Sequence, residues 1–449
     1  MNRYLNLHSL TAHSGVLLVR DANGRPKELP FGTATRTMLS PQTQRRAQRT
    51  HLREQANRAE GPLAPYAFGI RTREWARITA RALTTRDWTE QDAARAAKEA
   101  LTSLGVHFGS KERTADLTKV LIFAPESAGE DIAGALDEHR AEVDQWLTDL
   151  ETTRKTQEKN KKKRKTDDSE TPDDTASEEE AKTPPLPRAI KNKLLAALAP
   201  ADAIDIALFG RFLAEIAETP NVDGALQTMP AITVSRAAGI DDFYSAADDA
   251  KLTRRSRPTR PAGTSALDVF DDNGAGMTGY QSLTSGTFYA HSVLDRYKLR
   301  DNLTTAGMSP DTAEAAARAA EAAFIDAFCN AVPTAKQNTT AAPGTLPKLV
   351  LAFTDNRQHN YVGCFEDAID ETTAPASLQA TRRLLDHHRM IIRKRGIDPG
   401  RVLTYDLAIA QLLNELRSTD NLPATEVDTT ETLAAPHDPA LHDLTGMPA

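Results

Sequence analysis

Near its start the chain reads YLNLHSL over residues Tyr4–Leu10, where apolar and polar side chains alternate. Leu5 and Leu7 point to one side of such a segment, and Asn6 and His8 point to the other. This period of two predicts a β-strand.

A helix is predicted after this strand, because Ser40 is a favoured N-cap residue and Pro41 suits the first helical position. It runs to about Arg58. Further elements are expected as a strand at Ile204–Phe209, a strand over Thr287–Val293, a helix from Ser309 to Pro333 and a buried strand at Lys348–Phe353. The order βαββαβ predicts an α+β protein with the ferredoxin-like arrangement that RNA-recognition domains share.

Two long insertions interrupt this core, which we assign to residues 1–60, 200–211 and 284–355. Residues 61–199 form a helical insertion that contains all three tryptophans, Trp75, Trp88 and Trp146. Residues 212–283 are rich in glycine and proline and predict a long protruding arm. Residues 356–449 are expected to form a C-terminal helical region with an acidic tail.

Residues 151–188 change composition abruptly from a Lys/Arg run to a run of acids and then prolines. Such a segment buries too little apolar surface to offset the entropy of ordering, so we predict disorder. The basic run could bind nucleic acid or could simply be solvated beside its acidic neighbour. The Arg/Pro-rich stretch at 254–260 could also reach nucleic acid, or it could simply be loose.

Composition places the 449-residue chain among ordinary soluble proteins, with 40% hydrophobic and 26% charged residues. No apolar run has the length of a membrane span or of a signal-peptide core, so a cytoplasmic location without a membrane partner is expected. The net charge of −7 hides a polarised distribution. Residues 1–60 carry ten Lys or Arg against four acids, a net charge of +6. After Arg417 there is no Lys or Arg, and the charged residues are all Asp or Glu.

Enzyme motifs are mostly missing from the sequence. It has no phosphate-binding loop, no H-E-x-x-H and no G-x-S-x-G. Asp386, His387 and His388 are adjacent, but neighbouring histidines on a helix point about 100° apart, so one metal could hardly bind both. We therefore expect no catalytic residue, no metal and no cofactor.

The helix after Ser40 is unusually basic, with Arg45, Arg46, Arg49 and Arg53 in about two turns. Such a helix repels itself unless a polyanion runs alongside, and its N-terminal N–H groups suit a phosphate. A solvated basic helix is the alternative interpretation.

Seven blocks of this sequence, in the same order, resemble the CasC family, which forms the backbone of the type I-E CRISPR surveillance complex Cascade. They are Tyr4–His8 with His13 and Arg20-Asp21; Phe31-Gly32 before Ser40, Gln42, Arg45, Arg46 and Arg49; Asp205–Leu208 with Gly210-Arg211; Val222–Ala225; Phe243-Tyr244 before Asp248-Asp249; Ser285–Tyr289; and Val332-Pro333 with Ala335–Gln337. Beyond about residue 355 little resemblance remains.

The resemblance implies a ferredoxin-like palm, helical fingers and a hairpin thumb, in copies that stack head to tail along a guide RNA. It implies partners: the guide RNA, target DNA paired to that guide, and other Cascade subunits. The RNA contacts that it implies are phosphate contacts at Arg20, Ser40, Gln42, Arg45, Arg46 and Arg49, a wedge and stacking surface at Phe212, Phe243, Tyr244 and Met277, and an RNA-facing loop at Lys336 and Gln337.

A second hypothesis comes from a different class. Guide-processing endoribonucleases also use ferredoxin-like folds, and His8 or His13 could nominally serve as the proton-transfer group. The alternative for both histidines is packing or hydrogen bonding around the first strand.

The thumb of the CasC family usually includes tryptophan, whereas this chain has Asp242, Phe243 and Tyr244 there.

Overall fold

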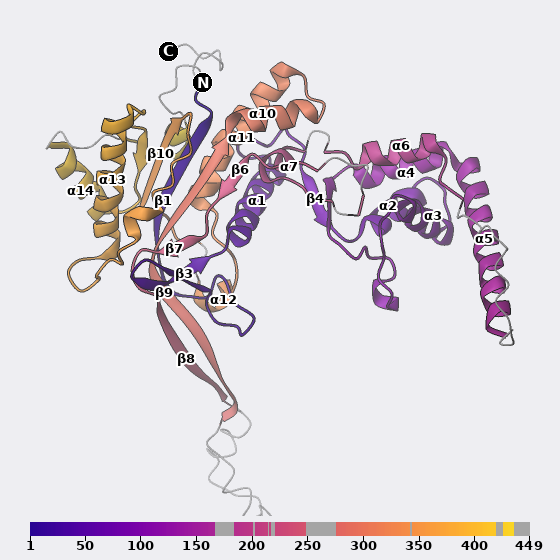
Figure 1. The fold of residues 1–449 in the computed structure, drawn as a ribbon, viewed down its shortest axis with the longest axis horizontal. Coiled ribbons are helices and arrows are strands. Elements are labelled where there is room, and N and C mark those ends of the chain that lie inside the picture. Colours follow the sequence, from indigo (N-terminus) through magenta and orange to yellow (C-terminus); the bar gives the residue numbers. More distant parts are fainter. Residues whose placement is uncertain are drawn as a thin grey trace, which may run out of the picture. The chain divides into compact units, whose positions relative to one another are not determined.

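Strand β1 (Tyr4–Val16) forms where the alternating sequence predicts it and lies near the middle of a large sheet (Figure 1). The computed structural model describes residues 1–166, 184–200, 203–213, 215–216, 221–247, 275–341, 344–418 and 425–434. The chain divides into two units, each described by itself. One comprises Met1–Leu63, Leu226–Arg296 and Arg318–Ala449, and the other comprises Ala64–Ala225 and Tyr297–Ala317.

The first unit contains a ten-stranded sheet within the described residues, in the order β12-β11-β10-β1-β9-β7-β3-β2, with β6 and β8 also paired to β9. Its strands are β2 (Glu28–Phe31), β3 (Ala34–Leu39), β6 (Leu226–Thr228), β7 (Ala231–Thr233), β8 (Ala238–Ala247), β9 (Ala275–Asp295), β10 (Leu349–Asp355), β11 (Arg401–Leu403) and β12 (Thr425–Glu426), beside β1. β1 pairs antiparallel with β10 on one side and with β9 on the other.

Helices cover both faces of this sheet. Helix α13 (Ala376–Arg395) and helix α14 (Leu407–Ser418) lie on one side, and α1 (Pro41–Asn57) lies on the other (Figure 1). Leu10, Phe353 and Leu384 belong to the core under α13. Because both faces are covered, residues Leu5 to Leu10 are all buried, polar ones included. The unit also holds α12 (Gln337–Thr340), the 3₁₀ turn η2 (Val362–Phe365) and α15 (Thr430–Ala434).

The predicted strand at Ile204–Phe209 is wrong, because these residues form the short helix α7. Ile204, Ile206 and Leu208 are buried, and so are Asp205 and Ala207 between them, so burial does not alternate as in a strand. A short apolar run has no period that separates a strand from a buried helix. The first strands after α1 in chain order that join this sheet are instead β6 and β7.

The second unit is mainly helical and has its own core, which includes Trp75, Trp88 and Trp146. Its elements are β4 (Gly69–Thr72), α2 (Trp75–Thr84), α3 (Glu90–Ser103), η1 (Glu112–Thr114), β5 (Ile122–Pro125), α4 (Ala128–Glu138), α5 (Arg140–Thr166), α6 (Arg188–Ala197), α7 and α10 (Arg296–Thr305, of which Arg296 belongs to the first unit). Helix α11 (Pro310–Asn330) has its first residues in this unit and the rest in the first.

The segment expected to be disordered, 151–188, begins as helix. Helix α5 starts at Arg140, where Val143, Trp146 and Leu150 are buried, and it continues to Thr166. Lysine and glutamate are good helix formers, so a packed first half can extend into a charged second half. Residues 167–183 lie outside the described residues, as does the stretch 254–260.

The C-terminal region is not only helical, since β11 pairs with β10 and β12 pairs with β11. Within the described ranges, no helix combines the length and the apolar character needed to cross a membrane.

Candidate nucleic-acid interface

Helix α1 presents part of its basic sequence on the surface. Gln42 and Arg46 are exposed, and Arg49 is half-buried. Ser40 is buried, and its hydroxyl lies 2.9 Å from the Thr43 hydroxyl and does not cap a backbone N–H. Gln42 and Arg46 are four residues apart and therefore neighbours on one helical face.

Arg45 turns inward, unlike Arg46. Its guanidinium donates to the Leu226 carbonyl at 2.6 Å and to the Thr228 hydroxyl at 3.3 Å, both on β6. Burial lowers the pKa of Arg45. The side chain therefore ties α1 to the sheet, a structural role that competes with the expected phosphate contact.

Arg20 lies exposed at the start of a tight turn that closes with a bridge to Pro26. Asp21 builds this turn, because its carboxylate accepts from the backbone N–H of Asn23 at 2.8 Å and of Arg25 at 2.9 Å. The geometry presents the cations Arg20 and Arg25 on a short, well-braced loop.

The hairpin of β8 and the first part of β9 carries the expected aromatic residues. Phe243 is 56% exposed, Tyr244 is 43% exposed and Met277 is 60% exposed. Phe243 pairs with Tyr280, which is 76% exposed, and their ring centroids lie 5.1 Å apart. Large apolar side chains in such exposed positions indicate a binding surface.

The two faces of this hairpin differ, because directly paired residues share a face and successive residues alternate. Phe243 and Tyr280 lie on one face, while Tyr244 and Met277 lie on the other. The ring of Tyr244 covers Gly279, where any Cβ would lie 2.5 Å from the phenol oxygen. The sequence predicted one surface containing Phe243 and Tyr244, whereas the structure separates them.

Lys336 lies in the loop that follows α11, Gln337 begins α12, and both are exposed. The Lys336 ammonium donates to the Gln281 amide oxygen at 3.2 Å, so this loop contacts the hairpin on the same face as Met277. Lys336 has a φ of 57°, a left-handed conformation that is unusual outside glycine.

Phe212 belongs to the other unit, where it is 78% exposed. It follows Arg211, which is buried and donates to the carbonyls of Leu198 at 2.6 Å and Phe123 at 3.3 Å. Burial lowers the pKa of Arg211 to about 10. The buried arginine anchors this segment and leaves Phe212 projecting from it.

Sequence reasoning missed Tyr280. The residue stands alone between glycine and glutamine in the sequence and has no local pattern. Only the register that places it opposite Phe243 shows that the two form a pair.

The histidines that could have served a nuclease lie inside the protein. His8 is fully buried and its ring lies 2.8 Å from the Tyr289 hydroxyl, and His13 is only 8% exposed. Burial lowers the pKa of His8 well below its usual value and that of His13 to about 4. Neither ring is positioned to reach a phosphate at the surface.

The Asp386, His387 and His388 group is divided between core and surface. His388 is buried, with its two ring nitrogens near the Tyr361 hydroxyl (2.9 Å) and the Pro399 carbonyl (2.9 Å), while Asp386 pairs with Arg389. Among the described residues, no group of three or more His, Cys, Asp or Glu side chains is arranged to hold a metal ion.

Comparison with solved structures found chains of similar fold. One is a chain of a CRISPR RNA-guided surveillance complex, pre-nicking, with a TM-score of 0.70 and 25% identity over 96% of this chain and 98% of that one. Another, from a CRISPR RNA-guided surveillance complex, has a TM-score of 0.63 and 20% identity over 99% of this chain and 100% of that one. No curated protein matches the chain. The family model of CT1975-like proteins matches residues 5–399, and the chain therefore belongs to the CT1975-like protein family.

Proposed function

We propose that this protein is a guide-RNA-binding backbone subunit of a CRISPR surveillance complex, of the type I-E CasC kind. Copies would polymerise head to tail along the guide RNA and present it for pairing with target DNA in antiviral defence. The observation that carries the proposal is that the aromatic side chains of the β8–β9 hairpin are exposed, as they would be in a binding surface. Similarity over nearly the whole chain to a chain of a surveillance complex supports it.

The order of the strands in the sheet supports the palm domain that this proposal requires. Strands β10, β1, β9 and β7 are neighbours and all pair antiparallel. With β6 and β7 as the second strand in chain order, and α1 and α11 as the crossover helices, this strand order supports a ferredoxin-like palm. The second unit and the β8–β9 hairpin would be the fingers and the thumb.

The chemistry of the interface suits recognition without regard to sequence. Arg46, Gln42 and Arg20 can contact backbone phosphates, and the hairpin aromatics can stack on bases. Neither type of contact occupies the base edges, which stay free to pair with DNA. The subunit would need no chemistry of its own.

An endoribonuclease is the competing function, and the burial of His8 and His13 counts against it. Incubation of the purified protein with a repeat-containing precursor RNA separates the two. We expect the RNA to remain intact, and cleavage at one specific site would contradict a purely structural subunit.

The phosphate contacts predict a specific salt dependence. Arg46→Gln with Arg49→Gln should weaken guide binding equally for all spacer sequences, because phosphates carry no sequence information. A plot of log affinity against log salt should lose about 0.7 units of slope for each single-strand phosphate contact removed. Binding titrations at several salt concentrations measure this.

Arg45→Gln is the matched control on the same helix. Because Arg45 hydrogen-bonds to β6, this change should lower the melting temperature and leave the salt slope nearly unchanged. An unchanged slope in the Arg46 and Arg49 variant would reject the phosphate assignment.

A further inference from the structure

Helix α1 is held against the sheet mainly by polar side chains. Of its 17 residues only Gln48 and Leu52 are buried, and one of these two is polar. The Gln44 amide donates to the carbonyls of Leu39 at 3.1 Å and Met229 at 3.0 Å. Most helices in proteins are stabilised by packing of an apolar face, so α1 lacks the usual main source of docking energy.

Gln48 weakens the docking further. Its side chain lies in a residue that is 4% exposed, and its amide oxygen has no hydrogen-bond partner among the described residues. Water can bind that oxygen when the helix leaves the sheet, so docking costs a hydrogen bond that the undocked helix makes. This cost offsets part of the gain from burying Leu52.

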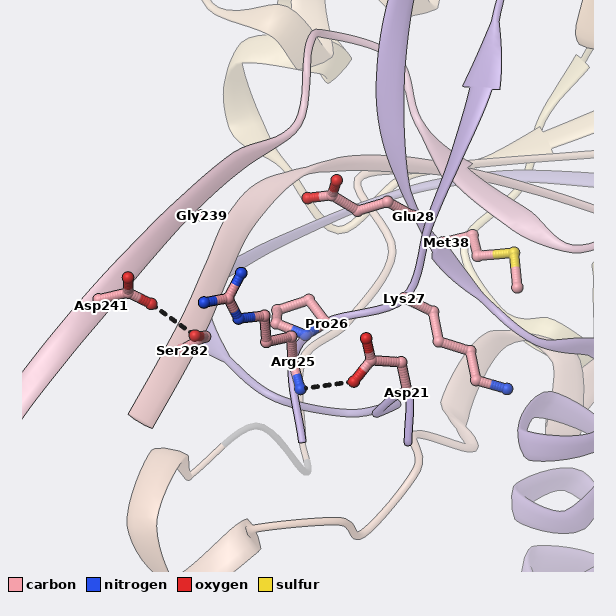
Figure 2. A pocket seen from close by; sticks show the side chains of 9 residues that line it. All are labelled: Asp21, Arg25, Pro26, Lys27, Glu28, Met38, Gly239, Asp241 and Ser282. Carbon is pink, nitrogen blue, oxygen red and sulfur yellow. Dashed lines mark hydrogen bonds between the residues drawn. The ribbon is translucent and has the colours of Figure 1, made fainter. Parts of the chain in front are cut away.

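The first turn of α1 is nevertheless fixed, because the helix follows directly on strand β3. The Met38 N–H donates to the Lys27 carbonyl at 2.8 Å, and Met38 also pairs with Ile232 of β7. Figure 2 shows Lys27 and Met38 beside each other at the edge of a cleft of about 550 Å³ at the base of the hairpin. Movement of α1 is therefore expected to be largest toward its C-terminal end.

The C-terminal half of α1 is fixed by one carboxylate. The His51 ring nitrogen Nε2 lies 2.8 Å from Oδ2 of Asp326, and the Gln55 amide donates to the same oxygen at 2.9 Å. His51 and Gln55 are four residues apart and share a face of the helix. Two bonds from successive turns to one atom fix the rotation of the helix about its axis. They thereby fix the direction in which Arg46 and Arg49 point.

Asp326 is itself held in place on α11. Asn330 donates to its other oxygen, Oδ1, at 2.7 Å, and the Thr430 hydroxyl of α15 donates to the same atom at 3.3 Å. Burial raises the pKa of Asp326, but hydrogen bonds from His51 and Gln55 outweigh it, so the pKa lies below its usual value. The acceptor is therefore a carboxylate, whose hydrogen bonds are stronger than those between neutral groups.

We propose that Asp326 is a positioning residue for the basic face of α1, and that docking of this helix is coupled to guide binding. RNA phosphates on the outer face would hold the helix in the orientation that Asp326 selects. Because only the docked helix presents its cations together, the apparent affinity for RNA is proportional to the docked fraction. This inference rests on the proposed RNA-binding function and assigns roles to side chains that do not contact RNA.

Hydrogen–deuterium exchange of the full-length protein tests the coupling, with and without a saturating oligoriboadenylate. Helix α13 is the internal reference, because seven of its residues, including Leu384 and Leu385, are buried. In the free protein the amides of α1 should exchange faster than those of α13. The RNA should slow exchange in α1 and leave α13 unchanged. Equal protection of the two helices in the free protein would contradict weak docking.

Asp326→Ala should lower the affinity for this RNA by about tenfold, because two hydrogen bonds to a charged acceptor no longer favour the docked helix. It should also speed exchange in α1. The slope of log affinity against log salt should stay at the wild-type value, since the cations and the phosphates that they contact are unchanged.

Asp355→Ala is the matched control. Asp355 also pairs with a histidine, but this partner is His359 at 2.6 Å and not a residue of α1. Exchange in α1 and the affinity for RNA should therefore stay as in wild type.

Gln48→Met changes docking in the opposite direction. Methionine fills a similar volume without an amide, so the cost of burying the Gln48 oxygen disappears. Exchange in α1 of the free protein should slow severalfold, and this second change should restore most of the affinity that Asp326→Ala loses. If Asp326 acted only through overall stability, its loss would lower the urea midpoint and leave RNA binding by the folded protein unchanged.

Two results would overturn this inference and leave the proposed function intact. One is wild-type affinity of the Asp326→Ala variant. The other is a smaller salt slope in that variant, which would mean that phosphate contacts are lost and that the docked fraction is not what changes. Wild-type protein that does not bind the oligoriboadenylate would instead contradict the proposed function and, with it, the coupling.

Discussion

Replacing Arg36 by methionine is expected to unfold the sheet-bearing unit at moderate temperature. Arg36 is fully buried, and its guanidinium donates to the carbonyls of Val234 at 2.6 Å and Phe365 at 2.7 Å, with longer bonds to other carbonyls nearby. Each buried carbonyl left without a donor costs about 1–3 kcal/mol. Loss of both short bonds would therefore cost several kcal/mol, of a total stability that is typically about 5–15 kcal/mol.

Urea unfolding followed by circular dichroism measures this loss. Arg236→Met is the matched control, because Arg236 is an exposed arginine whose charge lies near Arg36. We expect the control to remain within about 0.5 kcal/mol of wild type. Equal stability of the Arg36→Met variant and wild type would show that the guanidinium does not hold β3, β7 and η2 together.

The second large effect is a loss of stability in mild acid. Burial lowers the pKa values of His13, His291 and His388 to about 4. In the unfolded chain these imidazoles titrate near 6.5, so below that pH the unfolded state binds protons that the native state does not. The free energy of unfolding therefore has its full value above about pH 6.5. It falls as the pH decreases toward 4, by about 3 kcal/mol for each such histidine.

Urea midpoints at pH 7.5, 6.5 and 5.5 would measure this effect while most carboxylates remain ionised. His13→Asn removes one of the three groups and should make the decrease between pH 6.5 and 5.5 shallower. Unchanged midpoints over this range would mean that the histidines are protonated without cost in the native protein.

The parts of the fold that sequence predicts correctly are those with a local signature. The alternation in Tyr4–Leu10 and the Ser40-Pro41 start appear as β1 and α1, and Lys348–Phe353 contains most of β10. Ile204–Phe209 fails because six mostly apolar residues look the same in a buried strand and in a buried helix. The decision there depends on tertiary packing, which no window of that length contains.

The candidate interface also contains residues that the sequence indicates and residues whose contacts only the structure shows. Arg46, Phe243 and Lys336 are exposed, and the RNA contacts that the resemblance implies for them stay predictions. The inward turn of Arg45 depends on the carbonyl of Leu226, 181 residues away in the chain. The pairing of Phe243 with Tyr280 depends on strand register across the hairpin. Contacts of this kind are long-range, so composition and spacing around each residue do not reveal them.

Copurification of RNA tests the central claim most directly. The protein is expressed with the other genes of its operon and a CRISPR array, isolated by a tag on this chain, and the bound RNA is sized. A guide-binding backbone subunit should retain RNA of one uniform length, and the Arg46→Gln with Arg49→Gln variant should retain less of it. Complexes that form without RNA, or RNA of random length from the complete operon, would contradict the account.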